Sequence, residues 1–420
     1  MNTILLQPND ILFFRDGRPM SGASTGHGAA WPYPHVLNAA FHAALHRAEI
    51  ENVHAHRSGR SSQRDLDAKR DQKFGSLCTV GPFPVDGKGE WFFPRPADAQ
   101  SPLAVQCTLI PDTSAGGQSS LRKGLYPVLN TQPPSKEQPS NWFSRKAWQH
   151  YLDANVSELP KEHFPDDAVF SCAEHQIGIL INPDSGSTQD GGFYSAQYLR
   201  LANNWKLGLL AEAIDKINGS KDNRRDLIYQ LLDKEQHLLV GGQQRICTAE
   251  RVNSGELPLP QASAKLESSY VKWTLLSPAI FPEIGEHTGG WLPNWVDMQL
   301  NVQLLDGPGK NKAKRLGVSA GQAIRAKLVS AVVTGAQAIT GYSNSGDSVG
   351  AKSTHLAVPA GSVYYFQAEN DEQAQKLADA LNWHGSDSGM DTKIHNRRST
   401  LFGEKGFGLG VCSTWKPLSK

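Results

Sequence analysis

The sequence predicts an α+β fold built from two tandem ferredoxin-like domains. Segments whose apolar residues alternate along the chain are typical of half-buried strands, and three segments with apolar residues three and four apart are typical of helices. Their order is strand, helix, strands, helix, strand, and the same order then recurs. This is the ferredoxin-like pattern of an antiparallel sheet covered by helices. A chain of 420 residues has room for two to three domains at roughly 150 residues each.

The N-terminal half, residues 1–252, is predicted to form the first of these domains. Its expected elements are a strand at 3–14 interrupted at Pro8, a helix from His35 to about Glu49, a strand at 168–182, a turn-rich connector at 183–192, a helix at 222–234 and a strand at 237–252. Pro34 can open the first helix, because a proline at the first helical position loses no hydrogen bond. Gly241 and Gly242 inside the last strand indicate a bulge or a close approach of another segment.

Two insertions and one linker complete the predicted domain organisation. Residues 54–73 are polar without an apolar face, and residues 110–140 are rich in glycine and proline, so both are expected to be surface loops. Residues 253–264 are the expected linker. The C-terminal domain, 265–420, is predicted to contain strands at 270–277, 323–335 and 362–367, a helix at 370–383, a glycine-rich loop at 403–410 and a strand at 409–415.

Charge and cysteine content limit the class of protein. Lysine and arginine number 42 and aspartate and glutamate 41, so the formal net charge is +1. This excludes a histone-like or polybasic protein, although a local basic face can still contact phosphates. The five cysteines are dispersed without a C-x-x-C pair, which indicates reduced thiols and no structural zinc site. No apolar run approaches the ~18 residues that span a bilayer, so we expect a cytoplasmic protein without membrane contact.

The run GEKGFGLG at 403–410 is the most distinctive local motif. Four glycines in eight residues permit positive φ angles, and the exposed N–H groups of such a loop can hold phosphate oxygens. The run is not a nucleotide-binding P-loop, because no G-K-[ST] follows and the next element is a strand. A tight bulged hairpin with purely structural glycines is the alternative. The sequence supports the two interpretations equally.

Arginines and aromatic residues in loops are further candidates for RNA contacts. Arg15 and Arg18 flank a turn and can fork onto a phosphate, or Asp16 can pair with one of them and only shape the turn. Trp31 lies in a proline-rich loop, where an aromatic ring either stacks on an unpaired base or anchors the loop. His42 and His46 are four residues apart on the first predicted helix, but a metal site would need a third ligand.

Several segments, taken together, resemble a known family. They occur in the expected order along nearly the whole chain. They are DILFFRDGRP at 10–19, EHQIGI at 174–179, VGGQQR at 240–245, LSPAIF at 276–281, GWLP at 290–293, AVPAGSVYYF at 357–366 and the closing glycine-rich loop. Together they resemble the Cmr subunit three family, RAMP proteins of type III-B CRISPR effector complexes. One departure is His42, where relatives often carry arginine.

The resemblance implies a tandem ferredoxin-like (RRM-like) protein without nuclease activity, metal or cofactor. Such a subunit caps the effector complex and holds the 5′ repeat-derived tag of the guide (CRISPR) RNA. It contacts the large polymerase-like subunit and the neighbouring backbone RAMP subunit. The candidate RNA-binding residues are Arg15, Arg18, His27, Trp31, Arg245, Arg397, Arg398, Lys405, Gly406, Phe407, Gly408 and Gly410.

Two alternative functions remain compatible with the sequence. A metal-independent RAMP endoribonuclease that processes CRISPR repeat RNA would need a histidine general base and a cation to stabilise charge. A protein-only structural adaptor would need no RNA contacts.

Overall fold

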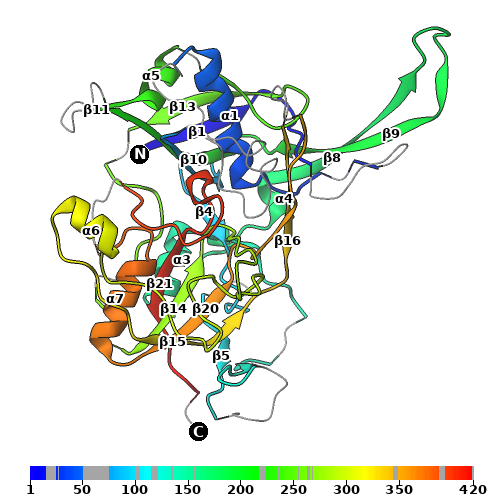
Figure 1. Cartoon of the computed structure of the whole chain (residues 1–420). Coiled ribbons are helices and arrows are strands. Elements are labelled where there is room, and N and C mark those ends of the chain that lie inside the picture. Colours follow the sequence, from blue (N-terminus) through cyan, green and yellow to red (C-terminus); the bar gives the residue numbers. More distant parts are fainter. Residues whose placement is uncertain are drawn as a thin grey trace.

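A computed structural model describes residues 1–15, 25–26, 28–50, 75–100, 105–114, 122–133, 136–155, 157–216, 224–234, 236–253, 255–262, 265–266, 268–343, 349–386 and 393–418. The predicted insertion at 54–73, Arg18 and His27 lie outside these residues. Within them, no helix is long and apolar enough to span a membrane. The fold is mixed α/β, and its sheets are mostly antiparallel (Figure 1).

The N-terminal sheet has the strand order β11-β10-β1-β13-β12, and β3 also pairs with β10. The strands are β1 (Asn2–Pro8), β3 (Leu77–Val85), β10 (Lys206–Lys216), β11 (Arg224–Asp226), β12 (His237–Leu239) and β13 (Ile246–Val252). All of these pairings are antiparallel. The helices α1 (Pro34–Arg47) and α5 (Leu227–Lys234) cover one face (Figure 1). Ile4 and Leu6 of β1 pack there against Leu37 and Phe41 of α1.

Helix α1 confirms the predicted helix within two residues at its C-terminal end. Pro34 occupies its first turn, and Tyr33 before it is extended without a side-chain cap. The helix ends at Arg47. Glu49 has a φ of 55°, a left-handed conformation that no right-handed helix can continue.

The segment 237–252 is a hairpin and not the single strand that the sequence predicts. Strands β12 and β13 pair with each other, and Val240 N–H donates to the Arg245 carbonyl across the turn. The turn exists because Gly241 has a φ of 77°. A Cβ on Gly241 would lie 2.5 Å from the Phe13 carbonyl oxygen. The predicted close approach of another segment at this glycine is therefore confirmed.

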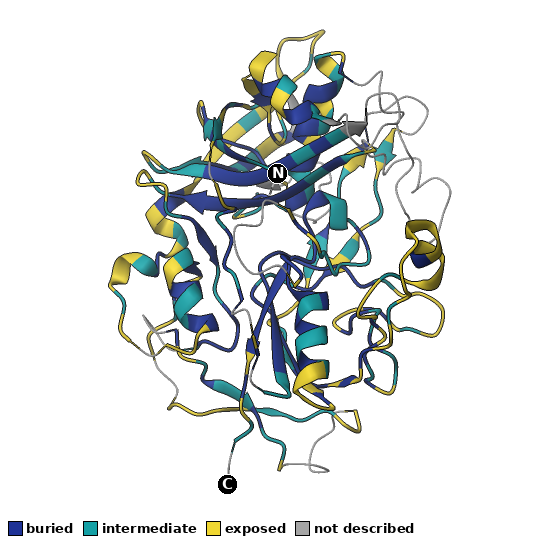
Figure 2. Cartoon of the chain, turned by 90° about the vertical axis from the view of Figure 1, so that its left-hand side faces the viewer, coloured by how far each residue is buried: buried dark blue, intermediate teal, exposed yellow. Residues whose placement is uncertain are grey.

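The C-terminal sheet has the strand order β15-β20-β14-β21, again antiparallel throughout. Its elements are β14 (Tyr270–Leu275), α6 (Lys310–Leu316), β15 (Ala326–Val332), β20 (Val363–Ala368), α7 (Asp371–Leu381) and β21 (Gly410–Thr414). The Asn370 side chain caps α7 by accepting from Gln373 N–H at 2.9 Å. Leu377 of this helix packs in one core with Trp273 and Phe366 of the sheet. Figure 2 shows that the strands of both sheets are largely buried.

A long hairpin of β8 (Ser171–Ile181) and β9 (Thr188–Leu201) projects from the body (Figure 1). The predicted connector at 183–192 is shorter than expected, because its last residues belong to β9. The two-residue strand β2 (Thr25–Gly26) pairs with β9 in parallel. The outer part of the hairpin exposes large apolar side chains: Ile177, Ile179, Leu180, Ile181, Phe193 and Tyr194.

A third apolar core lies between the two sheets. The elements between β3 and β8 are β4 (Phe92–Pro94), β5 (Leu109–Pro111), β6 (Val128–Asn130), β7 (Trp142–Ser144), α3 (Arg145–Leu152), the 3₁₀ turn η2 (Lys161–His163) and α4 (Asp167–Phe170). Trp148 and Tyr151 of α3 pack in this core with Val80 of the N-terminal sheet and Val411 of the C-terminal sheet. The segment after β3 is therefore a structural layer that both sheets share.

A buried ion pair joins this layer to the C-terminal sheet. Lys272 of β14 is 2% exposed and Asp98 is fully buried, and Lys272 Nζ lies 3.1 Å from Asp98 Oδ2. Tyr151 Oη donates to the same carboxylate at 2.8 Å and Tyr365 Oη at 3.1 Å. Burial, the largest single effect, disfavours the ammonium, but the Asp98 carboxylate and Cys107 act together against it through charge and hydrogen bonds, so the pKa of Lys272 is raised. Burial and Asp98 also raise the pKa of the neighbouring Cys107 thiol to about 12.

The glycine-rich segment, which contains the 3₁₀ turn η5 (Gly403–Lys405), packs beneath the first turn of α1. The Phe407 ring is fully buried and stacks on His35, with ring centroids 6.1 Å apart. Burial lowers the pKa of His35 to about 3, and Lys405 and Lys352 add to this effect. The imidazole at this contact between the two halves is therefore neutral.

Removal of one partner of the buried ion pair should destabilise the chain strongly. Lys272→Met leaves the Asp98 carboxylate buried without its cation, which costs about 3–5 kcal/mol. Denaturant titration of the full-length chain measures the free energy of unfolding. Lys206→Met is the control, because the Lys206–Glu250 pair is 30% and 63% exposed and contributes at most about 1 kcal/mol. Equal losses for the two variants would contradict this role of Lys272.

The stability of the chain should fall on acidification because His35 is buried in its neutral form. Between pH 6.5 and about 3 the unfolded chain binds a proton at this residue and the folded chain does not. The contribution of His35 to the free energy of unfolding is complete above pH 6.5 and decreases by about 1.4 kcal/mol per pH unit below it. His35→Leu should lose this part of the slope of unfolding free energy against pH. His175→Leu, at an exposed position, should keep it. An unchanged slope in His35→Leu would refute the prediction.

Candidate functional site

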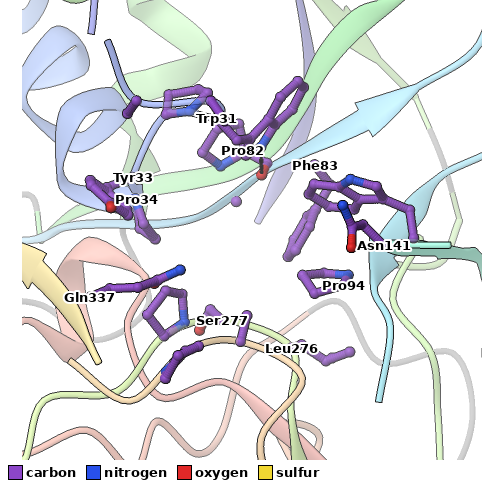
Figure 3. Close-up of a pocket in the computed structure, with 18 of the residues that line it drawn as sticks. Trp31, Tyr33, Pro34, Pro82, Phe83, Pro94, Asn141, Leu276, Ser277 and Gln337 are labelled. Carbon is purple, nitrogen blue, oxygen red and sulfur yellow. Dashed lines mark hydrogen bonds between the residues drawn. The ribbon is translucent and has the colours of Figure 1, made fainter. Parts of the chain in front are cut away.

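A pocket of about 370 Å³ lies between the two sheets (Figure 3). One wall comes from the proline-rich segment 29–34 and from β3. The opposite wall comes from loops of the C-terminal half at 276–278, 334–337 and 359–360. In Figure 3, Trp31 and Phe83 lie on the first side, and Ser277 and Gln337 on the other. The pocket therefore depends on how the two halves are held together.

Trp31 is fixed in the wall of this pocket by its own contacts. Its Nε1–H donates to the Pro82 carbonyl at 2.9 Å. Its ring lies edge-on to Trp142 and to Phe170, with centroids 5.6 and 5.3 Å away. These contacts support the interpretation that Trp31 anchors its loop, and the ring also lines the pocket.

Polar side chains at one side of the pocket are held by a carboxylate. Asp167 accepts from Trp142 Nε1 at 2.6 Å and from Asn141 Nδ2 at 2.9 Å. Gln337 and Ser277 add an amide and a hydroxyl from the C-terminal half. Rigid aromatic walls with a few fixed hydrogen-bonding groups suit a planar heterocycle such as an unstacked nucleobase.

The lining of this pocket contains no histidine, lysine or arginine among the residues that the structure describes. His42 is on α1, with its ring 5.1 Å from that of His46, and neither is part of the lining. In the same described part of the chain, no group of three or more acidic, histidine or cysteine side chains could hold a metal ion. The pocket can bind and orient, but it presents no general base with a cation beside it.

The glycine-rich segment is part of the contact between the two halves. Its N–H groups donate within the chain: Gly406 to Gly403, Phe407 to Phe402, Gly408 to the Pro278 carbonyl and Leu409 to Ser277 Oγ. Gly408 has a φ of 73°, and a Cβ there would lie 2.0 Å from the Ser399 nitrogen. These contacts favour the structural interpretation of the glycines. A Gly408→Asp variant would report on folding before it reported on RNA.

The cationic candidates near this segment are also turned inward. Arg398 Nε donates to the Ala380 carbonyl at 2.6 Å, and burial lowers the pKa of its guanidinium to about 10. Arg397 Nη2 lies 4.0 Å from Met1 Sδ. Lys405 is 6% exposed, and its Nζ lies 4.4 Å from the centre of the Phe402 ring. None of these three residues lines the pocket.

A second group of candidates lies at the base of the β8–β9 hairpin. Arg15 forms a β-bridge with Gly28, whose backbone lies against Gln197 of β9. The Arg245 guanidinium lies 5.1 Å from the centre of the Tyr198 ring and 4.0 Å from Asp10. The hairpin base continues along the chain through residues 28–34 into the pocket wall.

Carboxylates are part of the hairpin base as well. Arg200 Nε lies 2.7 Å from Glu174, and its Nη1 lies 3.0 Å from Asp10. The hydrogen bond from Arg200 lowers the pKa of Glu174. The charges of this group are largely balanced, since Arg245 also approaches Asp10. Of the residues predicted from the sequence to contact phosphate, Arg15 and Arg245 are the two that lie here.

Sequence reasoning missed most of the pocket. Phe83 comes from β3, and Asn141, Trp142 and Asp167 come from the layer between the sheets; the sequence predicted no element at these positions. The only local signal was tryptophan in a proline-rich context. The exposed apolar surface of the hairpin was missed too, because an alternating strand looks the same whether or not a partner covers it.

The family model for CRISPR-associated protein (Cas_Cmr3) matches residues 4–415. No curated protein sequence matches the chain.

Among solved structures, the chain is similar to one in a cryo-EM structure of the type III-B Cmr-beta bound to cognate target RNA and AMPPnP. The identity is 14%, 86% of each chain is covered and the TM-score is 0.43. A cryo-EM structure of the type III-B Cmr-beta bound to cognate target RNA gives 15% identity, the same coverage and a TM-score of 0.43. A crystal structure of the Csm3–Csm4 subcomplex of the type III-A interference complex gives 12% identity, coverage of 88% of this chain and 94% of the other, and a TM-score of 0.37.

The resemblance that the sequence segments indicated is thus confirmed over almost the full length. The chain belongs to the CRISPR-associated Cas_Cmr3 family.

Proposed function

We propose that this chain is a non-catalytic RNA-binding subunit of a cytoplasmic type III-B CRISPR effector complex. It caps the complex and holds the 5′ repeat-derived tag of the guide RNA beside the large polymerase-like subunit. The observation that carries the proposal is the aromatic pocket between the two halves, with Trp31 in its wall. Single-stranded RNA ends are recognised by splayed bases that enter such pockets.

The proposed domain organisation is two tandem ferredoxin-like domains, residues 1–252 and 265–420, joined by the segment 253–264. The strand orders support it. In the N-terminal half, β1, β3, β10 and β13 are the first to fourth main strands, and they lie in the order β3-β10-β1-β13. In the C-terminal half, β14, β15, β20 and β21 lie in the order β15-β20-β14-β21. In both halves the fourth strand lies beside the first, and the third lies between the first and the second. This is the order expected of a ferredoxin-like sheet. The pocket then lies at the junction of the two domains.

RNA binding in this proposal uses two parts of one continuous surface. A tag base stacks between the rings of the pocket, and Asn141, Ser277 and Gln337 supply hydrogen bonds to its edge. Arg15 and Arg245 at the hairpin base contact neighbouring phosphates, at the position where residues 28–34 leave β9 for the pocket. Phosphate contacts fix the register of the strand and base contacts add specificity.

The nuclease alternative finds less support in the described residues. Cleavage without a metal needs a general base and a cation near the reacting phosphate. The described lining has no cation, its one carboxylate, Asp167, accepts hydrogen bonds from Trp142 and Asn141, and the nearby His35 is buried in its neutral form.

The hairpin supports the neighbouring backbone RAMP subunit as a protein partner. Ile177 is 70% exposed and Ile181 60%, on a strand that no described segment covers on its outer part. Contiguous exposed apolar residues of this kind mark protein–protein contacts. We propose that the outer hairpin packs against that subunit.

Filling the pocket should weaken retention of the tag. Ala30 is exposed at the pocket, so Ala30→Trp adds bulk without removing a core side chain. Loss of one stacked base, about 1–3 kcal/mol, corresponds to roughly 5- to 150-fold weaker binding. The readout is the affinity of the assembled complex for tagged guide RNA relative to the same RNA without its tag. Ser157→Trp, at an exposed position outside the pocket, is the control. A ratio that does not change in Ala30→Trp would argue against the pocket as the tag site.

Charge on the outer hairpin should disrupt assembly without unfolding the chain. Ile177→Lys with Ile179→Lys places two cations where we propose an apolar contact, and both positions are at least half exposed. We expect co-purification with the backbone subunit to fall at least about tenfold, because the contact loses its apolar area. Thermal melting of the isolated chain should be unchanged. Gln176→Lys, exposed on the other face of the same strand, is the control. Intact assembly of the double variant would exclude this contact.

A further inference from the structure

A second and larger groove, of about 1090 Å³, runs along the edge strand β15 of the C-terminal sheet. Its walls come from residues 122–126, 298–302 and 367–369, and its floor from the first half of β15. The pocket described above borders the chain just after this strand, at Thr334. The groove and the pocket are thus at opposite ends of β15 and share no lining residue.

The walls of the groove are fixed by backbone hydrogen bonds. Val302 N–H donates to the Ala326 carbonyl at 2.9 Å, and Leu328 N–H donates to the Leu300 carbonyl at 2.9 Å. On the other wall, Tyr126 N–H donates to the Val329 carbonyl at 2.8 Å. The groove is therefore a built feature of the fold and needs no rearrangement to exist.

Positive charge is concentrated in this groove. Arg122, Lys123, Arg325 and Lys327 line it, against the single carboxylate of Glu369. Arg325 Nη1 lies 2.9 Å from Glu369 Oε2, but these side chains are 72% and 51% exposed, so water weakens their attraction. The whole chain carries a formal charge of only +1. The excess of cations is therefore local.

Helix α6 carries further cations, in the loop that joins the groove wall at 298–302 to the floor strand. The loop that carries it is closed at its base, where Ile324 N–H donates to the Leu304 carbonyl at 3.0 Å. The helix has the sequence KNKAKRL, and Ala313 is its buried residue. Cations on several sides of a helix do not serve packing against a core. Figure 1 shows α6 standing clear of the sheet, beside α7.

We propose that this groove and α6 bind the sugar-phosphate backbone of a single-stranded RNA segment, separate from the RNA end in the pocket. The groove is larger than the roughly 300–1,000 Å³ of small-molecule sites and is lined by lysine and arginine. Open positive grooves of this kind follow a phosphate backbone without reading its sequence. A protein partner is disfavoured because the cores of protein interfaces are depleted in lysine.

The test is the salt dependence of oligouridylate binding to the full-length chain. Two double variants are compared with the unchanged chain. One is Lys123→Gln with Lys327→Gln, in the groove, and the other is Lys310→Gln with Lys312→Gln, on α6. Each double variant removes two of the proposed phosphate contacts. Each pair should reduce the slope of log affinity against log salt by about 1.4, since a single-strand contact contributes about 0.7. Glutamine removes the charge while keeping a polar side chain of similar helix propensity, and thermal melting checks that the variants fold.

Matched controls separate this site from general charge and from the tag pocket. Lys88→Gln with Lys161→Gln removes two exposed cations elsewhere and should leave the slope unchanged. Ala30→Trp should also leave it unchanged, so failure of the pocket proposal and failure of this one are distinguishable. A slope unaltered in both groove pairs would overturn the proposal. Displacement of oligouridylate by oligoglutamate at equal concentration would overturn it as well, because the groove would then be a surface for an acidic protein segment.

Discussion

The buried pair of Lys272 and Asp98 is the interaction on which the arrangement of this protein depends. One partner belongs to the C-terminal sheet, and the other to the layer that follows β3 of the N-terminal sheet. A buried ion pair adds little net stability compared with apolar residues of the same size, but either charge alone in the interior is costly. The pair, with hydrogen bonds from Tyr151 and Tyr365, therefore selects one way of placing the layer on the sheet. The pocket exists only in that placement, because its walls come from both sides of the contact.

The glycine-rich segment is the second element of this contact. Its glycines are needed for close approach and for positive φ, and its N–H groups are used inside the chain. The segment lies between the first turn of α1 and the Ser277–Pro278 turn, so it sets the spacing of two stretches that line the pocket. Phe407 and the neutral His35 fill the space beneath that turn. The glycine-rich motif, which in sequence could bind phosphate, thus serves close packing and internal hydrogen bonding in the folded chain.

Three surfaces of different chemistry follow from the fold, and each suits a different contact. The pocket is aromatic with fixed polar groups, the outer hairpin is apolar and exposed, and the groove beside β15 is cationic. A chain with a net charge of only +1 can have all three surfaces because its excess of positive charge is local to one of them, the groove. The function that we propose, with contacts to RNA and to protein on one subunit, requires surfaces of such different chemistry.

The sequence by itself determined helices α1, α5 and α7, the strands of the C-terminal sheet, the close approach at Gly241 and the family, but it predicted neither β3 nor β10. These features depend on local periodicity, on proline and glycine conformation and on motif order, and each of these can be read from the sequence alone. It did not determine that residues 237–252 turn back as a hairpin, that the layer after β3 packs between the sheets, or that Arg398 and Lys405 face inward. Tertiary structure decided these, because burial of a residue depends on which distant segment lies opposite it. The pocket joins Trp31 to Trp142 and Gln337, and no local pattern connects residues so far apart in sequence.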